Sequence, residues 1–183
     1  SENVFYAATD ANGIMYATTR SGCLYVVNME DPSETIYVCD LNVVFTDLAY
    51  NRADGKVYGV TDRSELYSVD PILGTVNLLG KIAADTNTLT CDDQGNFYCV
   101  IRGVGNDRGT LCQFKLDNIS SPTYLAQGYQ IGMGIQALEW NPNDGCVYWM
   151  QHYLFYSHGG QFEHNYNYIY RFDLETGKIG RAS

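Results

Sequence analysis

Short apolar runs separated by polar turns recur along the whole chain. Each run has about four to six residues, is rich in Val, Tyr, Ile, Leu and Phe, and is bounded by Asn, Asp, Gly or Pro. This composition is typical of β-strands joined by tight turns. No segment of ten or more residues has the apolar spacing of an amphipathic helix. The pattern therefore predicts an all-β structure of about sixteen short strands with under about a tenth of the residues helical.

The apolar runs fall into four units. One run in each unit carries a glycine followed three residues later by a tyrosine: Gly13 and Tyr16, Gly55 and Tyr58, Gly95 and Tyr98, Gly145 and Tyr148. A further run precedes each of these and two follow it, so that each unit holds four strands. A period near 42 residues with four strands is typical of a β-propeller blade, in which we expect the tyrosine to fill the space between stacked blades. The sequence thus predicts one antiparallel β-propeller domain with four blades, approximately at residues 3–39, 40–82, 83–129 and 130–183.

Three stretches carry a resemblance to known repeats: LAYNRADGKVYGVTDRSELYSVDP (48–71), LEWNPNDGCVYWM (138–150) and YIYRFDLETGK (168–178). They resemble the YncE-, NHL- and YWTD-like repeats of bacterial secreted and cell-surface proteins, and most of all repeats found beside Ig-like and dockerin modules in gut anaerobes. The resemblance covers nearly the whole chain. It implies a β-propeller with an extracellular or cell-surface location, and it implies little about chemistry, because these motifs carry turns and packing.

The same resemblance leaves open whether four blades close into a ring, because repeats of this style usually form larger rings. The chain begins within an innermost strand and ends within an outermost one, so we expect four complete blades. They either close on themselves or form part of a larger propeller. An open set would leave two blade faces uncovered, which favours self-association.

Composition and charge exclude several classes of protein. With 45% hydrophobic and 14% aromatic residues, the chain is too apolar for a disordered segment. Its net charge of −10 disfavours binding to nucleic acid or to an anionic membrane surface. No apolar run is long enough to insert into a bilayer. The six cysteines form no C-x-x-C motif, and we expect most of them to be small buried hydrophobes, with Cys99 and Cys112 on neighbouring strands. No cofactor is expected.

The fourth unit carries an insertion between its second and third strands, QHYLFYSHGGQFEHNYNY (151–168). It holds every histidine of the chain and six aromatic residues, and we expect it to form a projecting hairpin. Three interpretations remain open. Its rings pack on the propeller, or they form a binding platform for a glycan or a protein, or His152, His158 and His164 bind a metal with Glu163. The six-residue histidine spacing matches no common ligand motif.

A propeller places the loops between second and third strands on the same face as the connections between blades. The insertion belongs to that face, and the candidate ligand-binding residues there are Trp149, His152, Tyr153, Tyr156, His158, Arg63 and Arg102. The chain has no Gly-x-Ser-x-Gly motif and no evident catalytic triad. We therefore predict a non-catalytic recognition or spacer module. The alternative is a hydrolase or lyase acting on a glycan or lactone at the central channel. A channel lined by apolar and small polar residues would favour the module.

Overall fold

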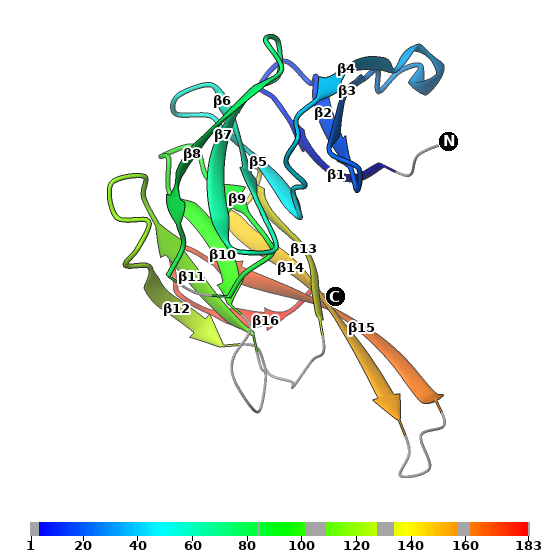
Figure 1. Cartoon of the computed structure of the whole chain (residues 1–183). Helices are drawn as coiled ribbons and strands as arrows, with labels where there is room; N and C mark the ends of the chain where they lie inside the picture. The colour runs from blue at the N-terminus through cyan, green and yellow to red at the C-terminus, as the bar shows by residue number, and fades with distance from the viewer. Residues whose placement is uncertain (1–3, 84, 102–108, 128–133, 157–161, 183) are drawn as a thin grey trace.

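The computed structural model of the chain describes the backbone of residues 4–83, 85–101, 109–127, 134–156 and 162–182 (Figure 1). These residues form sixteen strands in four antiparallel sheets of four strands each, and every sheet is built in chain order. The all-β prediction and the four-bladed propeller prediction are both confirmed. Among the described residues, no helix is long and apolar enough to cross a membrane. The described residues include one short 3-10 helix, Pro32–Glu34.

The strands of each blade are short except in blade 4. Blade 1 contains β1 (Val4–Thr9), β2 (Met15–Thr19), β3 (Cys23–Val27) and β4 (Ile36–Asp40). Blade 2 contains β5 (Asp47–Asn51), β6 (Lys56–Val60), β7 (Glu65–Asp70) and β8 (Thr75–Lys81). Blade 3 contains β9 (Thr90–Cys91), β10 (Phe97–Ile101), β11 (Thr110–Phe114) and β12 (Thr123–Gln127). Blade 4 contains β13 (Gly134–Asn141), β14 (Cys146–Tyr156), β15 (Phe162–Asp173) and β16 (Ile179–Arg181).

The first strand of each blade lies nearest the central axis, and these strands follow one another from β1 to β5, β9 and β13. Three buried apolar clusters fill the spaces between consecutive blades. The first joins blades 1 and 2 around Leu24, Phe45 and Leu48. The second joins blades 2 and 3 around Tyr58 and Phe97, and the third joins blades 3 and 4 around Tyr98 and Trp149. Because apolar burial is the main stabilising term in folding, these three clusters hold the blades together.

The turn between the first and second strands shares two features in all four blades. Its glycine adopts a positive φ, from 65° at Gly145 to 83° at Gly13, a conformation in which other residues are strained. An aspartate of the same turn accepts a hydrogen bond from the hydroxyl of the recurrent tyrosine. The pairs are Tyr16 with Asp10 at 3.3 Å, Tyr58 with Asp54 at 2.5 Å, Tyr98 with Asp92 at 2.8 Å and Tyr148 with Asp144 at 2.7 Å.

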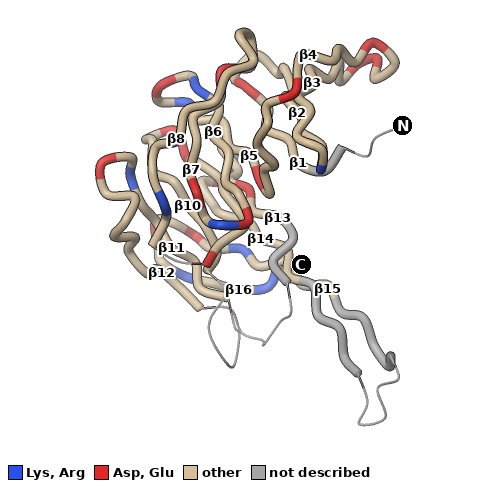
Figure 2. Tube along the Cα trace, viewed as in Figure 1, with Lys and Arg blue, Asp and Glu red and all other residues tan. Residues whose placement is uncertain are grey.

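These Asp–Tyr pairs give the recurrent tyrosine a second role besides packing. Tyr58 and Tyr98 are buried between blades, as the sequence predicts, and their hydroxyl groups need a partner there. The aspartate supplies it and also caps the turn: Asp92 accepts from the backbone N–H groups of Gln94 and Asn96, both at 2.9 Å. The carboxylates therefore serve the fold, and Figure 2 shows other acidic residues in turns as well.

The cysteines lie in strands, and the four at positions 91, 99, 112 and 146 are buried. Cys99 and Cys112 face each other directly across β10 and β11, as expected from the sequence. Burial raises the pKa of the Cys112 thiol to about 12, so that it stays protonated at neutral pH. The six cysteines are free thiols in the structure.

Candidate functional site

The turns between second and third strands and the connections between blades form one edge of the propeller, here called the loop rim. Its described parts are residues 20–22, 41–46, 61–64, 82–83, 85–89 and 109. At residue 64 the backbone has a φ of 61°, so the turn is tight and needs support. The Ser64 hydroxyl donates to the carbonyl of Thr86 at 3.2 Å and accepts from the Thr86 N–H at 3.0 Å. The Ile82 N–H donates to the Ser64 carbonyl at 2.8 Å. The turn is thereby fixed to the connection that leads into blade 3.

A hollow of about 740 Å³ lies beside this turn. The exposed Arg63 and the buried Ile82 both line it. The charged lining residues are Asp62, Arg63, Glu65, Lys81 and Asp85. Mixed charge around a small apolar patch suits a polar ligand that also presents an apolar surface.

A second hollow of about 270 Å³ adjoins the first at Asp62 and contains Arg20 and Tyr6. Arg63, which the sequence places on this face, thus lies together with Asp62 and Asp85 in the first hollow. Asp62 lines both hollows, and Arg20 lines the second one. The predicted residue Arg102 lies outside the described residues.

The insertion of blade 4 extends β14 and β15 far beyond the other strands. Strand β13 pairs with β14 as far as Gly134 opposite His152. Four further pairs join β14 and β15 alone, from Tyr153 opposite Tyr166 to Tyr156 opposite Phe162. At about 3.3 Å per residue the two-stranded ribbon continues for about 13 Å past the blade. Figure 1 shows it projecting away from the propeller, as predicted. We call residues 153–156 and 162–166 the arm.

Trp149 does not line a surface site, and here the sequence expectation is corrected. Its ring is buried against Tyr170, with ring centroids 5.1 Å apart, in the cluster between blades 3 and 4. The face of blade 4 that carries Trp149 is covered by blade 3, so that this large ring at the start of the insertion faces the neighbouring blade. Of the other predicted residues, His152, Tyr153 and Tyr156 belong to β14, and His158 lies outside the described residues.

The pairing of the arm also bears on the histidine cluster. His152 lies opposite Asn167, whereas His164 lies opposite Phe155. The two histidines are thus three pairs apart along the ribbon, about 10 Å at the usual rise of a strand. Because His158 lies outside the described residues, the metal interpretation stays a prediction.

A central pocket of about 300 Å³ lies on the axis and is lined by the innermost strands of all four blades. Most of its lining is apolar or small and polar: Ala7, Ala8, Thr9, Met15, Leu48, Ala49, Tyr50, Thr90, Cys91, Trp140 and Pro142. Arg52 and Glu139 are its charged members. Burial raises the pKa of Glu139 to about 7, and the positive charge of Arg52 partly opposes this rise.

Asp47 belongs to the innermost strand of blade 2, and burial raises its pKa well above the usual range. Its carboxylate accepts from the N–H of Leu89 in the connection to blade 3 at 2.8 Å and from the N–H of Leu48 at 3.0 Å. The charge of Glu139 adds to the rise. Neither carboxylate was predicted from the sequence. The available signal was an acidic residue beside apolar ones in a run predicted to be an innermost strand, as in the segment LEW at 138–140.

We expect the stability of the protein to fall as the pH rises from about 4.5 to about 7, the ordinary and the raised pKa of Glu139. The folded state holds the Glu139 proton more tightly than the unfolded state, so its stabilising effect is complete below the lower value and is lost through the upper one. Part of the side chain stays exposed, which limits the size of the effect. Urea unfolding at pH 5 and pH 8 should show a smaller difference for Glu139→Gln than for the parent. The exposed Glu30→Gln variant is the control, and an unchanged difference in Glu139→Gln would contradict the assignment.

Comparison with known proteins places the chain by fold alone. No protein-family model matches it, and no curated protein matches it. Among solved structures it is similar to the structure of putative TolB from Agrobacterium tumefaciens, with a TM-score of 0.61 and 16% sequence identity. The match covers 100% of this chain and 62% of that chain, so this chain spans less than two thirds of the length of that protein.

Proposed function

We propose that this chain is a non-catalytic recognition module of a secreted or cell-surface protein, which binds a glycan or a protein through the loop rim and the arm. The observation that carries the proposal is the arm, a two-stranded ribbon that continues about 13 Å beyond its blade at the usual rise of a strand. The other blades join the same two strands without such an extension where the turn is described, at residues 20–22 and 61–64.

An isolated two-stranded ribbon is marginally stable in water. The arm nevertheless carries an aromatic-rich sequence, with Tyr153, Phe155, Tyr156, Phe162 and Tyr166 in its two strands. Aromatic side chains offer flat apolar area with a polar tip, which suits the faces of sugar rings and the side chains of peptides. A ligand that covers these residues would stabilise the ribbon as well as bind to it.

The hollow around Arg63 supports the same proposal, because it lies on the loop rim, where the β14–β15 connection also belongs by topology. Its mixed charges add charged hydrogen-bond donors and acceptors to the tyrosine hydroxyl groups that the arm sequence offers. The central pocket supports a module rather than an enzyme, since most of its lining residues are uncharged. Glu139 with Arg52 is the observation that favours the hydrolase or lyase alternative, because a carboxyl group with a pKa of about 7 suits general acid–base catalysis.

The test replaces Tyr153 and Tyr156 together by alanine and compares binding to a glycan array and to a displayed peptide library. If the arm binds the ligand, affinity should fall by at least about 10-fold, which corresponds to about 1.4 kcal/mol. The melting temperature should stay close to that of the parent. Tyr124→Ala on β12 is the matched control, because Tyr124 is exposed and lies outside both the arm and the hollow. A destabilised double variant, made from a parent that binds nothing in either library, would overturn the proposal and assign the arm to packing.

A further inference from the structure

The three interfaces between blades follow one rule. Each blade has a leading face, which carries the recurrent tyrosine, and an opposite trailing face. Tyr16 packs on the cluster between blades 1 and 2, Tyr58 lies in the cluster between blades 2 and 3, and Tyr98 lies in the cluster between blades 3 and 4. The leading face of each of these blades therefore packs against the trailing face of the next. Blade 4 has the same tyrosine, Tyr148, which is half-buried.

The leading face of blade 4 is exposed where its counterparts are buried. In each blade, the residue two positions after the tyrosine lies in the second strand and pairs with a residue of the third strand. In blades 1 to 3 both members of this pair are 0% exposed: Thr18 with Leu24, Val60 with Leu66, and Val100 with Leu111. In blade 4 the pair is Met150 with Ile169, which are 38% and 49% exposed. Apolar residues thus occupy a position that is buried in the other three blades, and in the described part of the chain no blade covers them.

The trailing face of blade 1 shows the matching pattern. The residue before the tyrosine in the second strand pairs with one of the third strand, and in blades 2 to 4 both members are buried: Val57 with Val69, Phe97 with Phe114, and Val147 with Phe172. The counterpart in blade 1 is Met15 with Val27. Both are half-buried, and neither belongs to a buried cluster among the described residues. Tyr25 and Tyr37 pack edge to face on this side of blade 1, with ring centroids 5.6 Å apart.

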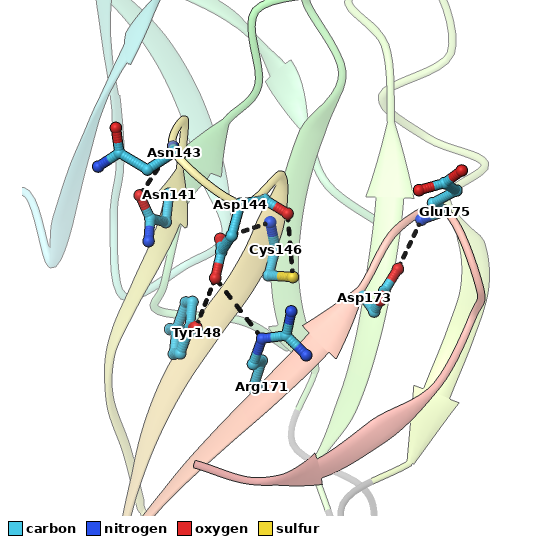
Figure 3. Close-up of polar contacts among 8 residues, drawn as sticks. All are labelled: Asn141, Asn143, Asp144, Cys146, Tyr148, Arg171, Asp173 and Glu175. Carbon is cyan, nitrogen blue, oxygen red and sulfur yellow. Dashed lines mark hydrogen bonds and ion pairs between the residues drawn. The ribbon is translucent and has the colours of Figure 1, made fainter. Parts of the chain in front are cut away.

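The polar groups on the leading face of blade 4 are already paired within the blade. Tyr148 donates to Asp144 at 2.7 Å, and Arg171 forms an ion pair with the same carboxylate at 3.5 Å (Figure 3). The corresponding Asp–Tyr pairs of blades 2 and 3 adjoin the buried interfaces. Covering this face would therefore leave no charge of the Asp144–Arg171 pair without a partner, so the usual penalty for burying an unpaired charge does not arise.

We propose that the leading face of blade 4 docks on the trailing face of blade 1 of a second copy of this chain, head to tail. The partner is a second copy because the trailing face of blade 1 has the pattern that leading faces bind three times within the chain itself. Such a contact joins two different surfaces, so each copy offers one of each, and association continues as an open filament unless the rotation between copies closes a ring.

The test measures molar mass by sedimentation equilibrium from about 1 µM to about 1 mM, a range that covers contacts of ordinary affinity. The parent should associate with rising concentration. Ile169→Lys on the leading face of blade 4 and Val27→Lys on the trailing face of blade 1 should each remain monomeric. Ile72→Lys is the matched control, because Ile72 lies in the β7–β8 turn, is 86% exposed and should leave association unchanged.

Mixing the two variants gives the decisive measurement. Val27→Lys keeps an intact blade 4 face and Ile169→Lys keeps an intact blade 1 face, so the mixture should form a heterodimer although neither variant associates alone. This recovery also shows that both variants are folded. A monomeric parent at the highest concentration would overturn the proposal, and would indicate closure of blade 4 on blade 1 or a different partner. Association of Val27→Lys alone would also overturn it, because the contact would then join two copies of one face.

Discussion

Replacing Trp149 by alanine is expected to lower the free energy of unfolding by about 3 to 5 kcal/mol, as truncation of a buried aromatic side chain usually does. Trp149 is among the largest fully buried side chains of the protein and packs between blades 3 and 4 against Tyr170. Its removal leaves a cavity in the cluster that joins these blades. Urea unfolding monitored by circular dichroism gives the change, and the midpoint should shift without loss of the β signal in the folded state.

Two comparisons separate this effect from a role in binding. Trp149→Phe keeps a ring in the cluster and should lose clearly less stability than Trp149→Ala. Met150→Ala changes the next residue, whose side chain lies on the exposed opposite face, and should cost little. If Trp149→Ala kept the stability of the parent and lost affinity for a ligand of the loop rim, the assignment of Trp149 to the core would be wrong.

Replacing Gly59 by alanine is expected to lower the free energy of unfolding by about 1 to 3 kcal/mol through overpacking. A Cβ atom at this position would lie 2.5 Å from the ring of Phe45. Phe45 is 0% exposed and packs edge to face on Tyr67 at 5.8 Å, so that its ring has little space to move away. The backbone of Gly59 does not have a positive φ, and the cost therefore comes from the clash alone.

Gly180→Ala is the matched control for this prediction. Gly180 also lies in a strand, has no positive φ, and has no atom within 4 Å of the place where its Cβ would lie. Its replacement should leave stability unchanged or slightly raised, because alanine restricts the unfolded chain more than glycine. Thermal melts of the two variants side by side give the comparison. Equal melting temperatures would contradict the packing argument.

The candidate site was partly predictable. The aromatic insertion at residues 151–168 stood out because it lengthens one of four otherwise similar units, and a long aromatic insertion between two strands favours a hairpin. The place of Arg63 on the loop rim followed from the topology of a propeller, and Arg63 lines the first hollow. Glu139 and Asp47 were not found, because their raised pKa values depend on which other blades surround them.

The sequence by itself determined the strands, the turns and the repeat. These features are local: alternating apolar residues form strands, a glycine with positive φ closes each turn, and the recurrence of Gly and Tyr marks the blades. The turn aspartates belong to the same local pattern, since each bonds a tyrosine four to six residues away.

Only the tertiary structure decided which side chains are core. The residue after the recurrent tyrosine is Ala17, Gly59, Cys99 or Trp149 in the four blades, and all four occupy equivalent places in their sheets. Their sizes differ because each faces a different neighbour, as Gly59 faces the ring of Phe45. Alternation along a strand cannot reveal this, since both faces of an inner blade are buried. The exposure of Met150 and Ile169 could not be predicted for the same reason. It depends on what packs beside blade 4, and the residue pattern of a strand does not specify its neighbour.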